Sequence, residues 1–347
     1  METSLATFLD EWNNASDCVL VHTSGSTGRP KPMLVEKRKM LNSARITCDF
    51  LGLKAGDTAL LCMPLDYIAG KMVVVRSIER GMRLITVKPS NHPLADISEI
   101  PVFAAMVPSQ VYCSLQVPEE RERLAGIKHL IIGGGAITHE LQAALNELYH
   151  EQQAASNEMY HEQQTILNDT SSFTPSLSHS FISRSGVIWS TYGMTETLSH
   201  IALRRLSGPQ ASAWYEPFDG VGLSLSPNGT LVIDAPAVCP ERLVTNDITE
   251  LAPDGRFRIL GRRDNTINSG GIKLQIEIIE ELLAPLLTCP FQVTAAPDPK
   301  LGEKVTLLTE APIPDELRKL LHDTLPPYHA PRLYITVETL PLTGSGK

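Results

Sequence analysis

Short apolar segments alternate with helical segments along the first half of the chain, and each apolar segment stops at glycine, proline or polar residues. This pattern predicts strands at 60–63, 83–87, 103–107, 130–132 and 187–189. It predicts helices at 36–51, 71–79 and 138–167. Short, continuously apolar strands between helices are typical of a mostly parallel sheet that helices cover on both faces. Because ligands of such α/β sheets bind beyond the carboxyl ends of the strands, we expect the functional residues there.

The second half of the chain has a different pattern. Residues 201–246 are rich in predicted strands, with a hairpin turn expected at 228–229. A further hairpin turn is expected just after this section, at 254–255. A small α+β part follows, with helices predicted at 277–287 and 314–321 and strands at 291–295, 304–309 and 333–337. We therefore expect an α/β fold with a large domain over 1–260 that includes a β-rich section. A hinge at 261–264 would join it to a small, mobile α+β domain over 265–347.

The composition excludes several classes of function. A hydrophobic content of 42% and a charged content of 20% are those of a soluble globular protein. The net charge of −9 argues against a general nucleic-acid or membrane-surface binder, so a phosphate site must be a local basic pocket.

None of the six cysteines forms a C-x-x-C pair, which favours free thiols in a reducing cytoplasm. Neither a signal peptide nor an apolar run of membrane-spanning length is present in the sequence.

Residues 23–31, Thr-Ser-Gly-Ser-Thr-Gly-Arg-Pro-Lys, follow the apolar run 19–21 and predict a loop that holds phosphates. The glycines allow close backbone approach, successive N–H groups form a nest for anions, and Arg29 and Lys31 supply positive charge. The P-loop motif of kinases is absent, because Gly28 is followed by Arg-Pro-Lys and the prolines would obstruct a helix there. A polar hairpin loop is the alternative interpretation.

Four further residues fit the same chemistry. Thr195 and Glu196 follow a predicted strand and offer a hydroxyl and a carboxylate for phosphate and for Mg²⁺, which prefers oxygen ligands. Asp247 is a carboxylate that can accept ribose hydroxyls, and Arg262 is a bidentate donor at the predicted domain junction. Each signal is weak alone, because a Thr-Glu pair often begins a helix and an aspartate after a strand is often a turn residue.

Motifs spread over nearly the whole chain point to one family. They are Thr-Ser-Gly-Ser-Thr-Gly-x-Pro-Lys (23–31), Gly-Gly-Gly-Ala (133–136), Tyr-Gly-Met-Thr-Glu (192–196), Thr-Asn-Asp (245–247), Gly-Arg-Arg-Asp (261–264), Ser-Gly-Gly (269–271) and Pro-Leu-Thr-Gly-Ser-Gly-Lys (341–347). In this order and spacing the motifs resemble those of the acyl-adenylate-forming superfamily of acyl-CoA synthetases, adenylation domains and luciferases. Residues 269–277 and 107–110 are most similar to the o-succinylbenzoate–CoA ligases of menaquinone biosynthesis.

The resemblance implies an AMP-forming acid–thiol ligase that uses ATP, Mg²⁺ and coenzyme A. Such an enzyme joins a small-molecule carboxylic acid to AMP with release of pyrophosphate, and a thiol then displaces AMP to give a thioester. The net charge and the free cysteines described above add the expectation of a cytoplasmic protein without nucleic-acid or membrane partners. A homo-oligomer stays open, because the sequence does not determine the oligomeric state.

The resemblance assigns roles residue by residue. The residues implied in ATP binding are Thr23, Ser24, Gly25, Ser26, Thr27, Gly28, Lys31, Gly133, Gly134, Gly135, Ala136, Tyr192, Gly193, Asp247 and Arg262. Thr195 would contact the α-phosphate, Glu196 would hold Mg²⁺ and Lys347 would bridge the substrate carboxylate and the phosphate. Asp264 would be the hinge. The channel for coenzyme A would involve Ser269, Gly270 and Gly271.

The acyl substrate needs its own partners, because o-succinylbenzoate carries a second carboxylate. Lys71 is the candidate cation and Ser109 a hydrogen-bond donor, with Gln110 and Tyr67 also near the expected acyl site. The alternative for Lys71 is an exposed lysine at the start of a helix.

The chain also departs from the superfamily pattern. Tyr67 stands where relatives often have histidine, and Asn246 stands where they commonly have glycine. Only about twenty residues precede the phosphate loop, and the opening methionine favours a naturally short member over a fragment. The sequence Asn-Glu-Leu-Tyr-His-Glu-Gln-Gln at 146–153 recurs with one change at 157–164. This period of 11 predicts a duplication that lengthened a surface helix.

Three other functions are weighed against this one. The first is the same chemistry with another acid, or with a carrier-protein thiol in place of coenzyme A. The second is a catalytically silent nucleotide-binding or scaffold protein, against which the residues Thr195, Glu196, Asp247 and Arg262 argue. The third is a P-loop kinase, which the spacing of the phosphate loop disfavours.

Overall fold

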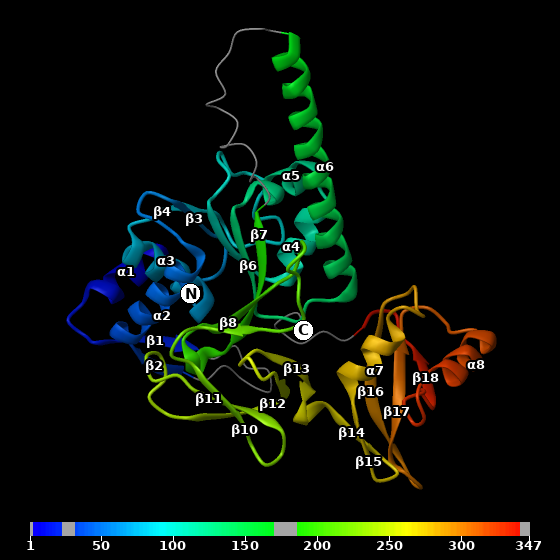
Figure 1. Cartoon of the computed structure of the whole chain (residues 1–347). Helices are drawn as coiled ribbons and strands as arrows, with labels where there is room; N and C mark the ends of the chain where they lie inside the picture. Colours follow the sequence, from blue (N-terminus) through cyan, green and yellow to red (C-terminus); the bar gives the residue numbers. More distant parts are fainter. Residues whose placement is uncertain (1–2, 23–31, 170–185, 341–347) are drawn as a thin grey trace. The chain divides into compact units, whose positions relative to one another are not determined.

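The structure is a computed structural model that describes residues 3–22, 32–169 and 186–340, with only the backbone described at 155–169. Two compact units make up the chain (Figure 1). The first unit holds the described residues up to Val221 together with Ala235–Glu241, and the second holds Gly222–Asp234 and the described residues from Arg242 onward. The predicted boundary at 261–264 lies inside the second unit, where it connects two sheets, and it stays a prediction.

A seven-stranded sheet forms the centre of the first unit, with the strand order β4-β3-β5-β6-β7-β8-β9. Neighbours from β4 to β7 pair in parallel, whereas β8 and β9 are antiparallel additions at one edge. The strands are β3 (Thr58–Leu61), β4 (Arg83–Thr86), β5 (Phe103–Met106), β6 (His129–Ile132), β7 (Val187–Gly193), β8 (His200–Arg205) and β9 (Glu216–Pro217). The prediction of a mostly parallel sheet is confirmed.

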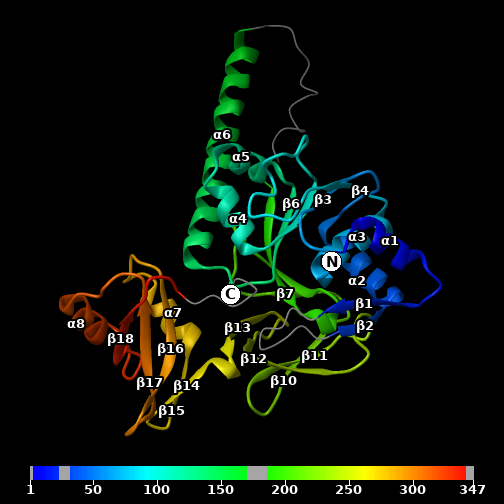
Figure 2. The same ribbon diagram turned by 180° about the vertical axis from the view of Figure 1, so that it is seen from behind.

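Helices cover both faces of this sheet (Figures 1 and 2). The helices of this unit are α1 (Leu5–Asn13), α2 (Lys37–Leu51), α3 (Ile68–Arg80), α4 (Pro108–Leu115), α5 (Pro118–Gly126) and α6 (His139–Asp169). The chain steps from β3 to β4 in one direction along the sheet and from β5 to β7 in the other. Since parallel crossovers are right-handed, α3 lies on one face and α4, α5 and α6 lie on the other. Helix α2 packs against α3, and α4, α5 and α6 contact one another.

A separate two-stranded antiparallel sheet precedes the large one. Strand β1 (Cys18–His22) pairs with β2 (Pro32–Glu36), and residues 23–31 between them lie outside the described residues. The carboxylate of Glu11 on α1 links this sheet to α3, because it accepts from the Leu20 N–H at 2.8 Å and from Lys71 Nζ at 3.1 Å. Lys71 is 3% exposed, and its ammonium also lies 4.7 Å from the centre of the Phe8 ring.

The second unit contains two sheets. An antiparallel sheet has the order β10-β11-β12-β13, and its strands are β10 (Gly222–Leu225), β11 (Thr230–Asp234), β12 (Leu243–Leu251) and β13 (Phe257–Arg262). The other sheet has the order β15-β14-β17-β16, with β18 parallel to β17. Its elements are β14 (Thr266–Ser269), β15 (Ile272–Gln275), α7 (Ile276–Leu283), β16 (Phe291–Asp298), β17 (Gly302–Thr309), α8 (Asp315–Thr324) and β18 (Leu333–Thr336). The predicted small α+β part and both predicted hairpins are confirmed.

Some elements had no prediction from the sequence. Helices α4 and α5 are short and begin at prolines, and α5 has a weakly amphipathic sequence, so apolar periodicity could not reveal it. The strands β14 and β15 are only four residues each. The duplicated segment is helical, as predicted, because α6 continues through it to Asp169. The Ser/Thr-rich composition of 168–180 is typical of a flexible loop, but α6 includes the first two of these residues, and 170–180 lie outside the described residues.

The ion pair between Glu11 and Lys71 predicts unequal effects of removing each partner. Glu11→Ala leaves the buried Lys71 ammonium without its partner, so we expect a loss of about 3 kcal/mol in the free energy of unfolding. Lys71→Met fills the same space with an apolar chain and leaves Glu11 near water, so the expected loss is below about 1 kcal/mol. Urea denaturation of both variants measures the two values. Equal losses would contradict a structural role for this pair.

Candidate functional site

Some of the predicted site residues lie outside the described residues. These are Thr23, Ser24, Gly25, Ser26, Thr27, Gly28, Lys31 and Lys347. Their roles stay predictions. The apolar run 19–21 lies in strand β1, which ends at His22 directly before the loop.

The glycines at 133–135 come directly after β6, at the carboxyl end of a central parallel strand. Gly133 faces β7 so closely that a Cβ atom there would lie 2.2 Å from Thr191 Oγ1. Gly134 has a φ of +80°, which favours glycine, and a Cβ at Gly135 would crowd Pro108 at 3.3 Å. The three glycines therefore let the chain leave β6 close to β7 and to the start of α4.

The end of β7 carries Tyr192 and Gly193, which follow the part of β7 that pairs with β6. The Tyr192 ring lies 5.8 Å from the ring of Tyr215. A Cβ at Gly193 would lie 2.1 Å from the carbonyl oxygen of Ser199, so only glycine lets the chain fold back here into β8. The turn between β7 and β8 contains Thr195 and Glu196.

Thr195 and Glu196 form a short 3₁₀ turn with Thr197. The Thr197 hydroxyl holds this turn together, because it accepts from the Met194 N–H at 3.0 Å and lies 2.7 Å from the Ser199 carbonyl oxygen. The turn ends at Leu198, whose φ of 65° is rare for a residue with a side chain. Such a costly conformation persists only where the surroundings hold it, so the turn is built with a fixed shape.

Thr195 is 5% exposed, whereas the Glu196 side chain points to solvent. Among the residues that the structure describes, no arginine, lysine or histidine pairs with Glu196, and no cluster of three metal-binding side chains is present. One exposed carboxylate fits Mg²⁺, which binds proteins through one or two carboxylates and keeps water and phosphate oxygens as its other ligands. Glu196 is therefore suited to hold Mg²⁺ together with a phosphate.

A line of buried and partly buried polar groups runs beneath this turn. Arg76 on α3 donates from Nη2 to Ser199 Oγ at 2.8 Å, and Ser199 Oγ lies 3.1 Å from His200 Nδ1. His200 Nε2 lies 3.1 Å from Thr47 Oγ1, which donates to the Ser43 carbonyl oxygen. Since the Thr47 proton goes to that carbonyl, His200 must donate from Nε2 and accept at Nδ1. This is the neutral form, and burial together with the Arg76 charge holds the pKa of His200 well below its ordinary value.

Arg76 is the candidate functional residue that the sequence analysis missed. It is 1% exposed, its Nε has no hydrogen-bond partner, and no carboxylate pairs with it within the described part of the chain. Burial lowers the pKa of Arg76 to about 10, so the guanidinium stays charged at neutral pH. A buried cation without a counter-ion is costly unless an anion comes to it. In the sequence, this residue could have been noticed because a charged arginine stands in a predicted helix directly after four apolar residues, 72–75.

The candidate acyl residues have differing environments. Lys71 is committed to Glu11, as described above, so the alternative of an exposed lysine at a helix start is wrong. The Gln110 amide is 5% exposed, and it donates to the carbonyl oxygens of Cys62 and Ser90 and accepts from the Val107 N–H. Its hydrogen bonds hold strand ends together, which is a structural role. Tyr67 is 44% exposed and Ser109 also faces solvent.

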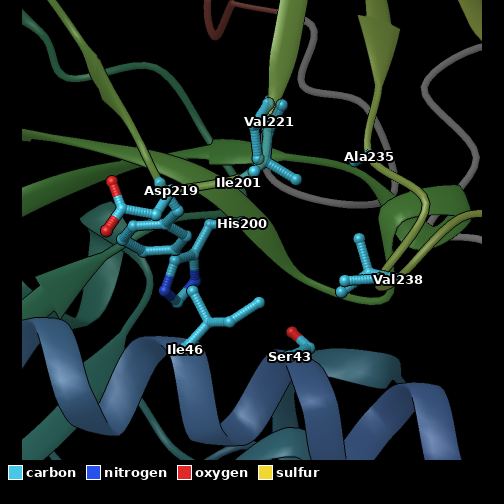
Figure 3. A pocket seen from close by; sticks show the side chains of 11 residues that line it. Ser43, Ile46, His200, Ile201, Asp219, Val221, Ala235 and Val238 are labelled. Atoms are coloured by element: carbon cyan, nitrogen blue, oxygen red, sulfur yellow. The ribbon is translucent and has the colours of Figure 1, made fainter.

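A small pocket lies beside His200 in the first unit (Figure 3). Ser43 and Ile46 on α2 lie on one side of it, and Val221 and Val238 contribute to its apolar wall. Its volume of about 20 Å³ holds roughly one water molecule. The pocket is therefore too small for an organic substrate.

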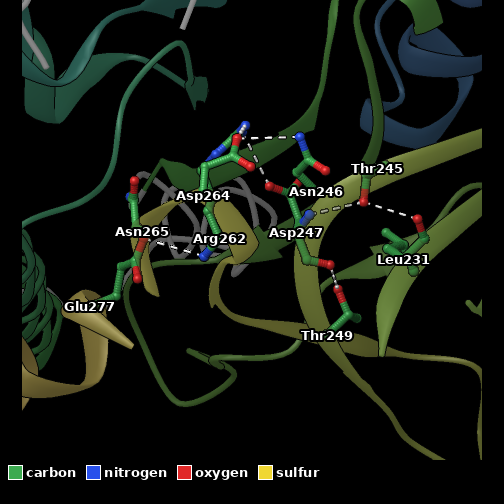
Figure 4. Close-up of polar contacts among 9 residues, drawn as sticks. All are labelled: Leu231, Thr245, Asn246, Asp247, Thr249, Arg262, Asp264, Asn265 and Glu277. Atoms are coloured by element: carbon green, nitrogen blue, oxygen red, sulfur yellow. Dashed lines mark hydrogen bonds and ion pairs between the residues drawn. The ribbon is translucent and has the colours of Figure 1, made fainter. Parts of the chain in front are cut away.

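The second unit brings Asp247 and Arg262 together (Figure 4). They are direct partners across β12 and β13, and Arg262 Nη1 lies 3.4 Å from Asp247 Oδ1. Asp247 is 9% exposed, and its backbone N–H donates to Thr245 Oγ1 at 3.1 Å. Arg262 also donates from Nη2 to Asp264 Oδ2 at 3.0 Å. The pair therefore presents a carboxylate and a guanidinium side by side, and its role in binding ribose stays a prediction.

The predicted residues Ser269, Gly270 and Gly271 lie where β14 turns into β15. Ser269 pairs with Ile272, which makes a two-residue hairpin turn of Gly270 and Gly271. Their φ values of +62° and +84° explain the glycine pair, because such turns need a positive φ at both positions. Ser269 is 3% exposed, and the role of this turn in binding coenzyme A stays a prediction.

No helix in the described part of the chain is long and apolar enough to cross a membrane.

Comparisons with curated proteins find relatives of low identity. The chain is 24% identical over 374 residues to a 2-succinylbenzoate–CoA ligase of Listeria monocytogenes, covering 98% of this chain and 70% of that protein. It is also 24% identical over 386 residues to gramicidin S synthase 2 of Brevibacillus brevis, covering 96% of this chain. The chain spans only 8% of the length of that synthase.

Solved structures share the fold. An acyl-CoA synthetase (AMP-forming)/AMP-acid ligase II-like protein from Dyadobacter fermentans matches with a TM-score of 0.61 and 29% identity, covering 98% of this chain and 89% of that one. An o-succinylbenzoate coenzyme A synthetase from Bacillus subtilis, in complex with ATP and magnesium ion, matches with a TM-score of 0.68 and 20% identity, covering 94% and 68%. At 20% identity this second likeness supports the fold alone.

A family model provides the assignment. The model described as AMP-binding enzyme matches residues 5–240, which is more than half of the chain. This span contains the glycines after β6, the turn of Thr195 and Glu196 and the buried Arg76. The chain therefore belongs to the AMP-binding enzyme family.

Proposed function

We propose that the protein is an AMP-forming acid–thiol ligase. It joins a carboxylic acid to AMP with consumption of ATP, and it then transfers the acyl group to a thiol. The observation that carries this proposal is the exposed carboxylate of Glu196, without a cationic partner among the described residues, on a rigid turn at the glycine-lined strand ends of an AMP-binding enzyme.

The mechanism follows from charge. A carboxylate that attacks the α-phosphorus of ATP is an anion approaching an anion, so catalysis is mostly positioning and neutralisation. Glu196 would hold Mg²⁺, which neutralises phosphate charge when bound. Thr195 would donate its hydroxyl to the α-phosphate, and the loop at 23–31 would supply N–H groups to the β- and γ-phosphates. Lys347 would bridge the attacking carboxylate and the phosphate.

The remaining residues would hold the rest of the nucleotide and the thiol. The glycines at 133–135, Ala136 and Tyr192 would line the adenine site, and the pair of Asp247 and Arg262 would bind the ribose hydroxyls. After adenylation, a rotation at Asp264 would replace Lys347 by the thiol, which would enter past Gly270. These roles rest on the resemblance of the motifs and on the two local arrangements described above.

The acid that we propose is o-succinylbenzoate, which would place the enzyme in menaquinone biosynthesis. The similarity of residues 269–277 to ligases for this acid and the 24% identity to a 2-succinylbenzoate–CoA ligase support it. The second carboxylate of this substrate needs a buried cation. Lys71 already pairs with Glu11, whereas Arg76 lies beneath the catalytic turn without a carboxylate among the described residues, so we assign this role to Arg76.

A second candidate function is adenylation of another acid for a carrier-protein thiol. The match to gramicidin S synthase 2 over 96% of the chain favours it. Pyrophosphate exchange with a panel of acids identifies the acid, and addition of coenzyme A or of a carrier protein with a pantetheine arm identifies the thiol. Hydroxamate formation with ATP and each acid tests the ligase proposal itself. If no acid gives exchange or hydroxamate, the protein is not a ligase for those acids, and a silent nucleotide-binding protein becomes the better description.

Replacement of the metal-binding carboxylate predicts a specific loss. Glu196→Gln keeps the size of the side chain but removes its charge, so we expect pyrophosphate exchange to fall by about 100-fold or more. The Mg²⁺ concentration needed for half-maximal exchange should rise. The measurement is exchange against Mg²⁺ concentration. The control is Glu119→Gln, an exposed glutamate on α5 that should behave as wild type. A Glu196→Gln variant with unchanged Mg²⁺ dependence would remove Glu196 from the metal site.

Replacement of the buried arginine predicts a change in substrate binding. Arg76→Met removes the cation for the second carboxylate, so the KM for o-succinylbenzoate should rise by about 10- to 100-fold. The KM for 4-oxo-4-phenylbutanoate, which keeps the succinyl carboxylate but lacks the carboxylate on the ring, should rise much less. The KM for ATP reports separately on the turn that Arg76 supports. Steady-state kinetics with each substrate measures these values, and Arg80→Met on the surface end of α3 is the matched control. An equal rise for both acids would show that Arg76 does not contact the second carboxylate.

A further inference from the structure

The side chain of Asn246 makes a contact that the proposed mechanism does not use. Asn246 lies on β12 next to Asp247, and its amide Nδ2 donates to Asp264 Oδ2 at 3.2 Å (Figure 4). The same carboxylate oxygen accepts from Arg262 Nη2 at 3.0 Å. Asp264 belongs to the short 3₁₀ segment η2 (Arg263–Asn265), which connects the two sheets of the second unit. Two donors from the first sheet therefore hold one atom of the connecting segment.

The other side of this connection is held as well. Glu277 at the start of α7 accepts from the Arg262 N–H at 3.3 Å and from Asn265 Nδ2 at 2.7 Å. Gly261 has a φ of +150°, and a Cβ there would lie 2.6 Å from Glu277 Oε2. The backbone from Gly261 to Asn265 is thus closely packed against Glu277. A turn of the chain at Asp264 would have to break its bonds to Asn246 and Arg262.

Arg262 alone is a weak anchor for Asp264. Its guanidinium is shared, because Nη1 faces Asp247 Oδ1 while Nη2 faces Asp264 Oδ2. A ligand that draws Arg262 toward Asp247 weakens the hydrogen bond between Arg262 and Asp264. The Asn246 amide is not shared in this way, because within the part of the chain that the structure describes it donates a hydrogen bond to Asp264 only. The restraint on the connection therefore depends on the residue at position 246.

We propose that Asn246 is a positioning residue that fastens the hinge Asp264 to strand β12. The contact restrains the connection at 261–264, and it thereby sets how readily the part after the hinge changes orientation between the two half-reactions. This inference rests on the proposed function for the two half-reactions, but the restraint itself does not. An alanine at position 246 removes the donor, and an aspartate places a second carboxylate beside Asp264.

Limited proteolysis tests the restraint without any activity. Trypsin cleaves after arginine, and Arg262 and Arg263 lie at this connection. Since one hydrogen bond of this kind contributes about 1 kcal/mol, Asn246→Ala should raise the rate of cleavage there about fivefold. Asn246→Asp should raise it further through repulsion between like charges. Mass spectrometry of the fragment ends separates this cleavage from cleavage elsewhere. Cleavage of both variants at the wild-type rate would overturn the proposal.

Two further variants sharpen this test. Gln292→Ala removes an amide on β16 in the same unit, away from the connection, and should cleave as wild type. Asp264→Ala removes the acceptor, so adding Asn246→Ala to it should cause no further increase. A double variant in which both increases add fully would show that Asn246 acts through some other contact, and the proposal would fail.

Kinetics of the two half-reactions tests the functional part. In Asn246→Ala, the ratio of overall thioester formation to pyrophosphate exchange should change by about fivefold. The KM for ATP should stay near the wild-type value, because Asp247 and Arg262 are intact. An unchanged ratio would overturn the role of Asn246 in positioning the hinge. Absence of exchange in the wild-type protein would instead overturn the proposed function, and the proteolysis result would still decide whether the restraint exists.

Discussion

The close parallel pairing of β6 and β7 is the constraint on which the candidate site of the first unit depends. Gly133 has no side chain, so Thr191 of β7 can lie against it, and Gly193 lets the chain fold back over the end of β7. The glycines after β6 and the turn with Glu196 therefore emerge at neighbouring points of one sheet edge. A side chain at either glycine would push the strand ends apart.

The turn is also held from below, and this support explains its shape. The polar chain from Arg76 through Ser199 and His200 to Thr47 has one consistent direction of hydrogen bonding. It joins α2 and α3 to the segment that follows Glu196, and it helps to keep Leu198 at its unusual φ. The same guanidinium keeps a buried positive charge beside the site. One residue thus serves both the architecture and, in our proposal, the recognition of a dicarboxylic acid.

The second unit uses a different device to present charged groups. Asp247 and Arg262 are cross-strand partners in an antiparallel pair, so the ladder itself sets their separation. Arg262 then extends to Asp264, and Asn246 adds a second donor to that carboxylate. The candidate ribose residues and the candidate hinge are consequently members of one hydrogen-bonded group. Arg262 bonds to both Asp247 and Asp264, so a change at Arg262 affects the contacts of both carboxylates.

The α/β class, most helices and strands, and the positions of the motifs at strand ends could be predicted from the residues alone, because apolar periodicity and glycine placement are local properties. Asp247 could also be placed near Arg262, since a hairpin joins them. The bond of Lys71 to Glu11 and the burial of Arg76 without a carboxylate among the described residues became known only from the folded chain. The same holds for the bond between Asn246 and Asp264. Burial and partners depend on residues far apart in the chain, which no local pattern records.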